Sequence, residues 1–110
     1  LAYGEHLYWV NDSAEAVCME IATGEVVSKR TVEGLVRSKR FSFYASMVRV
    51  QDRLYAVSRY NGTFVFEANP MMKQIAQNKF ADRSDFSGTP ALSQGAIYLR
   101  SGKFVYCVGE

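Results

Sequence analysis

Short apolar segments separated by turn residues recur along this chain, and they predict β-strands. Three of these segments contain a tyrosine at the same position, and they span residues 7–10, 54–57 and 97–99. A second apolar segment follows each of them after a short turn, at residues 16–20, 64–67 and 104–108. Apolar and aromatic segments of this length, joined by Asn, Ser and Gly, are typical of β-hairpins. The pattern therefore predicts three consecutive hairpins.

The hairpins repeat at a regular interval, because Tyr8, Tyr55 and Tyr98 are 47 and 43 residues apart. A tyrosine at the same place in each repeat favours packing between repeats over a ligand cage. In the second strands of the hairpins, Cys18, Val65 and Cys107 are equivalent positions, 47 and 42 residues apart. The turn of the second hairpin contains Asn61 and Gly62, a pair that favours the positive φ angles of a type I′ turn.

Further strands are predicted on either side of the hairpins. Apolar segments precede them at residues 1–3, 45–50 and 88–93. Others follow the first two hairpins at residues 25–32 and 72–79. Residues 70–77 would also suit a helix by composition, and their assignment to a strand depends on the repeat. The repeating unit is thus a four-stranded antiparallel meander.

Such a meander, repeated every 40 to 50 residues or so, is typical of a β-propeller blade. We therefore predict an all-β fold, a β-propeller fragment of about two and a half four-stranded antiparallel blades over residues 1–110. Residues 1–34 would form a blade lacking most of its inner strand, residues 41–83 a complete blade, and residues 85–110 a blade lacking its outer strand. A β-sandwich is the alternative, and the order of Trp9 before both cysteines disfavours it.

The length of 110 residues limits how much of a propeller the chain can form. Closed propellers have roughly four to eight blades. We therefore expect either that the chain is the C-terminal fragment of a longer protein or that self-association supplies the remaining blades.

Composition excludes several classes of protein. Hydrophobic residues make up 48% of the chain and there are only two prolines, which indicates an ordered chain with a core. The apolar segments are far shorter than the roughly 18 residues of a membrane helix, so no membrane span is expected. The net charge of +2 is too small to indicate a nucleic-acid partner by itself.

Side chains suited to catalysis are scarce. The single histidine, His6, precedes the first hairpin and is expected in a solvated turn, and the two cysteines, Cys18 and Cys107, are expected to be small buried side chains. A zinc site needs three or four closely spaced ligands, and the common phosphate-binding and nucleophile motifs are missing from the sequence. We therefore predict no catalytic, cofactor-binding or metal-binding residues and no cofactor, and we favour a non-enzymatic role.

Two charged segments have both a functional and a structural interpretation. Residues 29–40 contain five basic residues and one acidic residue, which would suit phosphates or an acidic partner. Lysine and arginine on an outer strand also prevent edge-to-edge pairing, and we favour that interpretation over nucleic-acid binding. Asp82 and Asp85 would suit a cation or a basic ligand, but we favour a polar connection between blades.

Two segments, which together with the repeat cover nearly the whole chain, carry a family resemblance. Residues 7–27, which end in a turn with Thr23, Gly24 and Glu25, resemble the bacterial pyrroloquinoline-quinone-like (PQQ-like) β-propeller repeat. Residues 86–110 are similar to the last repeat of such proteins. Enzymes of that family have a docking tryptophan four residues after the glycine, where this chain has Ser28, and the second repeat has Asn69 and Pro70 in place of the Thr-Gly pair.

The resemblance implies a function and a location. It implies a non-catalytic interaction or scaffolding segment of an exported bacterial protein, in the periplasm or another extracytoplasmic compartment. The implied partner is the chain itself, as an oligomer, or the missing part of a longer chain, and a different protein is also possible. The alternative is part of a larger quinoprotein-type oxidoreductase whose catalytic residues lie outside this chain.

Overall fold

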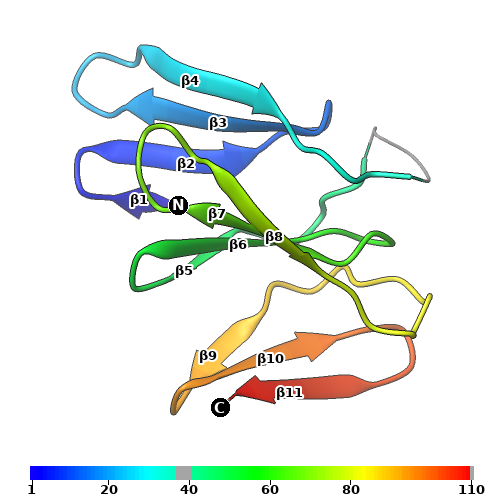
Figure 1. Ribbon diagram of the computed structural model, residues 1–110. Helices are drawn as coiled ribbons and strands as arrows, with labels where there is room; N and C mark the ends of the chain where they lie inside the picture. The colour runs from blue at the N-terminus through cyan, green and yellow to red at the C-terminus, as the bar shows by residue number, and fades with distance from the viewer. Residues whose placement is uncertain (37–40, 110) are drawn as a thin grey trace.

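The computed structural model describes residues 1–36 and 41–109, and in this part of the chain the fold is all-β, without a helix (Figure 1). Its strands form three separate antiparallel sheets of four, four and three strands. The predicted all-β class is therefore confirmed. Of residues 70–77, which by composition would suit a helix, residues 74–77 lie in the strand Gln74–Asn78, and residues 70–73 lie in the connection that precedes it.

The sheets follow one another along the chain, and each is an up-and-down meander. The first sheet consists of β1 (Ala2–Tyr3), β2 (His6–Val10), β3 (Glu15–Glu20) and β4 (Val26–Thr31). The second consists of β5 (Val48–Val50), β6 (Arg53–Val57), β7 (Thr63–Glu67) and β8 (Gln74–Asn78). The third consists of β9 (Ala91–Ser93), β10 (Ala96–Arg100) and β11 (Val105–Gly109).

The register of the three hairpins repeats as expected. The paired residues are Tyr8 with Cys18, Tyr55 with Val65, and Tyr98 with Cys107. The outer strands repeat as well, because the register between third and fourth strands shifts after Cys18 in the first sheet and after Val65 in the second. These matched positions make the three hairpins structurally equivalent.

The type I′ turn predicted at Asn61 and Gly62 is wrong. The hairpin loop contains five residues, 58–62, and the Ser58 amide donates to the Gly62 carbonyl at 3.0 Å. Of the two residues, only Gly62 has a positive φ, at 84°. Asn61 is instead buried, and its Oδ1 accepts a hydrogen bond from the Val36 amide, a contact with a distant segment that a local turn preference does not include.

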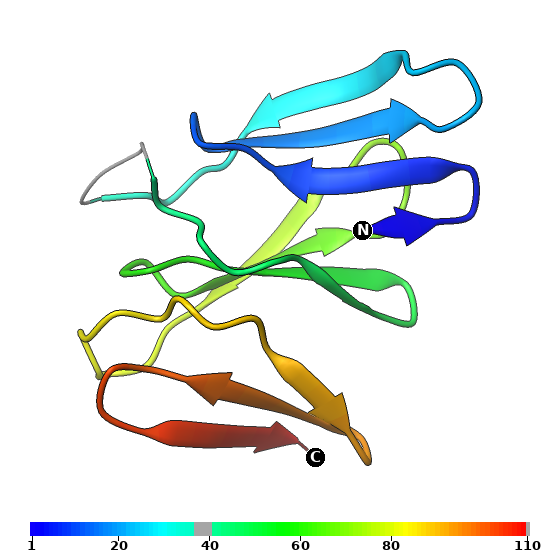
Figure 2. The same ribbon diagram turned by 180° about the vertical axis from the view of Figure 1, so that it is seen from behind.

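The three sheets are stacked one on another, with the first and third sheets at the two ends of the stack (Figures 1 and 2). Between the first and second sheets lies the larger apolar core, which includes Tyr8, Ala16 and Cys18 from the first sheet and Leu54, Ala56, Phe64 and Phe66 from the second. The second core, between the second and third sheets, contains Val57, Phe86 and Leu99, with Ala45, Ile97 and Tyr106 packed against it.

All three sheets are stacked in the same sense. Successive residues of a strand point to opposite faces, so Tyr55 and Val57 share one face of the second sheet while Leu54 and Ala56 share the other. The first sheet turns its Tyr8 face toward Leu54 and Ala56, and the second sheet turns its Tyr55 face toward the third sheet. The first and second sheets thus each place the face with the repeated tyrosine against the opposite face of the next sheet.

Candidate functional site

The connections between sheets and the loops between second and third strands gather at one end of the stack, which we call the loop end (Figure 1). Asn11, Ser58 and Ser101 open the three hairpin loops there, each three residues after a repeated tyrosine. Their amides close the loops by donating to the carbonyls of Glu15, Gly62 and Phe104 at 3.0, 3.0 and 2.9 Å. A short polar residue at this spacing is a repeat signal that the sequence interpretation missed.

The side chains of these three residues also satisfy the loop amides. Asn11 Oδ1 accepts from the amides of Ser13 and Glu15, at 3.0 and 2.9 Å. Ser101 Oγ accepts from the amides of Lys103 and Phe104, at 3.1 and 3.0 Å. Local hydrogen bonds of this kind hold turns. The loop end is therefore built in the same way in each sheet, as an architectural feature.

Asp82 ties the connection between the second and third sheets to the third sheet. Its carboxylate accepts hydrogen bonds from Ser101 Oγ at 2.5 Å, Ser84 Oγ at 2.6 Å and Tyr106 Oη at 2.8 Å. These donors, Ser101 first among them, hold the pKa of Asp82 well below its usual range. The structure therefore supports a polar connection at this residue, and the carboxylate is already occupied by protein donors.

Asp85 forms an ion pair at the loop end. Arg59 Nη2 lies 2.6 Å from Asp85 Oδ2, and Arg59 Nε donates to the same carboxylate at 3.1 Å. The hydrogen bond from Arg59 lowers the pKa of Asp85. The guanidinium also stacks over the ring of Tyr44, 4.2 Å from its centroid. Among the described residues, no group of three His, Cys, Asp or Glu side chains could hold a metal ion.

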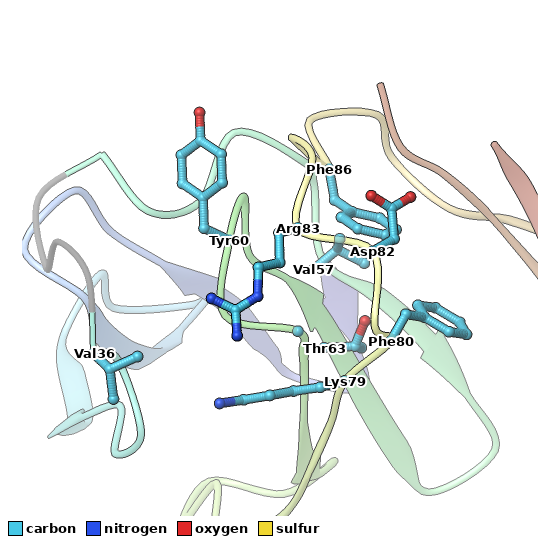
Figure 3. Close-up of a pocket in the computed structure, with 10 residues that line it drawn as sticks. Val36, Val57, Tyr60, Thr63, Lys79, Phe80, Asp82, Arg83 and Phe86 are labelled. Atoms are coloured by element: carbon cyan, nitrogen blue, oxygen red, sulfur yellow. The ribbon is translucent and has the colours of Figure 1, made fainter. Parts of the chain in front are cut away.

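A cleft of about 210 Å³ opens beside these loops, between the second sheet and the connection that follows it (Figure 3). Its lining residues are Val36, Val57, Tyr60, Gly62, Thr63, Lys79, Phe80, Asp82, Arg83 and Phe86. Figure 3 shows the charged ends of Lys79 and Arg83 on the Val36 side of the cleft, away from the Asp82 carboxylate. Small-molecule sites usually enclose about 300 Å³ or more. The lining combines positive charge with apolar surface, without a nucleophile beside a base.

The repeated tyrosines do pack between sheets where a neighbouring sheet is present. Tyr8 is only 2% exposed and belongs to the core between the first and second sheets. Tyr55 is half-buried on the face toward the third sheet, beside Ile97 and Leu99. Tyr98 is 39% exposed, because no described segment of the chain covers its face of the third sheet. The prediction of packing between repeats is thus confirmed for Tyr8.

The two cysteines differ in burial in the same way as the tyrosines with which they pair. Cys18 is buried against the second sheet, as predicted. The prediction that Cys107 is buried is wrong, because Cys107 is an exposed free thiol. Cys107 pairs with Tyr98 and therefore lies on the same uncovered face of the third sheet.

Burial of Tyr8 predicts a loss of stability at alkaline pH. Burial of the side chain, and after it the Cys18 thiol, raises the pKa of Tyr8 from 10.0 to about 12. An unfolded chain releases this proton near pH 10, so the stabilisation is complete below pH 10 and is lost as the pH rises toward 12. The loss is about 3 kcal/mol. Urea denaturation at stepped pH should show this fall in the wild type and a smaller one in Tyr8→Phe; equal falls would contradict the burial.

The basic residues of β4 and Ser28 have positions that serve the fold. Lys29 and Arg30 are exposed on β4, an edge strand in the described sheet, which agrees with protection of the edge. The remaining basic residues of that segment, at positions 37, 39 and 40, lie outside the described residues. Ser28 donates a hydrogen bond to the Pro70 carbonyl and so joins the first sheet to the second.

The expectation of a solvated turn at His6 is wrong. His6 is the first residue of β2, where it pairs with Tyr3 and Glu20 and is half-buried. Its ring centroid lies 6.1 Å from that of Tyr8, on the same face of the strand. The strand begins one residue earlier than the apolar segment, and this extension carries His6 into the sheet.

Within residues 1–36 and 41–109 there is no helix that is long and apolar enough to cross a membrane.

Comparison with known proteins adds no family to these observations. No family model matches the chain, and no curated protein matches its sequence at a significant level. The surfaces and contacts of the three sheets are therefore the basis for a functional conclusion.

Proposed function

We propose that this chain is a non-catalytic interaction or scaffolding segment, built as a fragment of a PQQ-like β-propeller. The observation that carries the proposal is the stacking of three antiparallel sheets in one sense, tyrosine face against opposite face. Propeller blades are antiparallel sheets repeated around an axis, and successive blades cover each other in this way. The resemblance of residues 7–27 to the PQQ-like repeat supports the choice of family and a place outside the cytoplasm.

A stack of this kind has an apolar face at each end, and such faces support a role in interaction. On the third sheet, Tyr98 is 39% and Val105 is 71% exposed on the face that no described residue covers. Contiguous apolar surface that is exposed to solvent is a mark of interaction sites. The loop end, by contrast, supplies the Arg59–Asp85 ion pair and hydrogen bonds that hold the sheets together.

The proposal predicts that equivalent tyrosines differ in their effect on folding. Tyr8→Lys places a charge in the buried core and should lower the free energy of unfolding by more than about 4 kcal/mol. Tyr98→Lys changes an exposed position and should lower it by less than about 1 kcal/mol. Urea denaturation at low protein concentration measures both. Equal losses would show that the Tyr98 face serves the fold of the chain, and would overturn the interaction role.

A quinone titration separates this role from that of an oxidoreductase. Pyrroloquinoline quinone with Ca²⁺ should show no stoichiometric binding in calorimetry, because the described carboxylates Asp82 and Asp85 are occupied by protein donors. Stoichiometric binding followed by alcohol-dependent reduction of a dye would instead support a quinoprotein and contradict the non-catalytic role.

A further inference from the structure

The two end faces of the stack match each other. The free face of the third sheet includes Tyr98 and Cys107, which are equivalent to Tyr8 and Cys18 of the first sheet by hairpin register. The free face of the first sheet includes Leu7, and neither apolar core includes this residue. Figures 1 and 2 show these sheets at opposite ends of the stack. Each end face therefore lacks a neighbouring sheet in the described chain.

The free face of the first sheet is equivalent to a face that already receives a tyrosine. Leu7 pairs with Met19 as Leu54 pairs with Phe66 in the second sheet. Leu54 and Phe66 belong to the core that holds Tyr8. The two end faces of this chain thus correspond to the two sides of an interface that the chain forms internally.

One pair of residues makes the match more specific. Val57, two residues after the repeated tyrosine of the second sheet, packs with Leu99 of the third. The position of Val57 is taken in the third sheet by Arg100, which is exposed, and the position of Leu99 is taken in the first sheet by Trp9. Continued stacking would place the Arg100 guanidinium on the Trp9 indole. A guanidinium over an indole is a favourable cation–π contact, and tryptophan is the best aromatic acceptor for it.

We propose, on the basis of the proposed function, that a second copy of this chain docks head-to-tail. The Tyr98 face of one copy then lies against the Leu7 and Trp9 face of the other. Head-to-tail contacts between identical chains either close into a ring or continue into a filament. Each chain has three sheets, so two copies together have six. This total falls within the range of roughly four to eight blades in closed propellers. The product is therefore a closed dimer, in which both end faces of each copy are covered by the other copy.

The mass of the protein in solution tests the dimer. Light scattering after size exclusion, from about 1 µM to 1 mM, should reach twice the chain mass of 12.4 kDa and stop there. Arg100→Glu should raise the dissociation constant about tenfold, and Met71→Lys, at an exposed turn residue away from both faces, should leave it unchanged. A monomer throughout this range, or growth beyond the dimer, would overturn the proposal.

Mixing two variants tests the head-to-tail arrangement. Tyr98→Lys blocks one face and Leu7→Lys the other, so each variant alone should be monomeric, with circular dichroism confirming its fold. Their mixture retains one intact interface and should form a heterodimer. Absence of the heterodimer from folded variants would overturn the arrangement. If the wild type is monomeric and Tyr98→Lys does not affect folding, the second copy is rejected as the partner and the interaction role stays in place. If Tyr8→Lys and Tyr98→Lys lower the free energy of unfolding equally, the interaction role itself is rejected.

Discussion

Replacing Phe64 by alanine is expected to lower the free energy of unfolding by about 3–5 kcal/mol. Phe64 is fully buried on β7, in the core between the first and second sheets, and its ring packs 5.7 Å from that of Phe43. Truncation removes apolar contacts from both sheets and leaves a cavity that a two-sheet core cannot readily close. Chemical denaturation followed by tryptophan fluorescence measures the change, since Trp9 lies in the first sheet.

The matched control for this substitution is Phe104→Ala. Phe104 is 59% exposed, so its truncation should change the free energy of unfolding by less than about 1 kcal/mol. Similar losses in the two variants would mean that Phe64 does not lie in a core between sheets.

Replacing Gly62 by alanine is expected to destabilise the protein by about 3 kcal/mol or more. Gly62 has a φ of 84°, and a Cβ added there would lie 2.3 Å from the Asn78 carbonyl oxygen. Both the backbone conformation and the neighbouring strand β8 therefore oppose the change. A shift in the midpoint of urea denaturation measures it.

Gly24→Ala separates the two causes. Gly24 has a similar φ of 73°, but an added Cβ would meet nothing within 4 Å. The free energy of unfolding of this variant should fall only by the cost of a left-handed conformation, about 1–2 kcal/mol. If Gly62→Ala were no worse than Gly24→Ala, the close approach of the second hairpin loop to β8 would be wrong.

The features of the fold that the sequence predicts well are local ones. Alternating apolar residues around Tyr8, Tyr55 and Tyr98 predict hairpins, and the repeated spacing predicts their register, because hairpin pairing depends on neighbouring residues and short turns. The loop at Asn61 could not be predicted in this way. Its conformation depends on a hydrogen bond to Val36, a residue 25 positions earlier on the connection between the first and second sheets.

The same distinction applies to the loop end. The sequence predicts a polar connection at Asp82 and Asp85, since aspartate favours turns. It does not identify their partners, because Arg59 lies 26 residues from Asp85 and Tyr106 lies 24 residues from Asp82. The exposure of Cys107 was missed for a related reason. The repeat makes it equivalent to the buried Cys18, but equivalence does not say whether a neighbouring sheet is present.

The most direct test of stacking in one sense is a nuclear Overhauser spectrum with methyl and ring assignments. The account predicts contacts between the Tyr8 ring and the Leu54 methyl groups, and between the methyl groups of Val57 and Leu99. Contacts of the Tyr8 ring with the Val57 methyl groups would instead place two tyrosine faces against each other. That result would contradict the stacking on which the proposed function and the head-to-tail dimer depend.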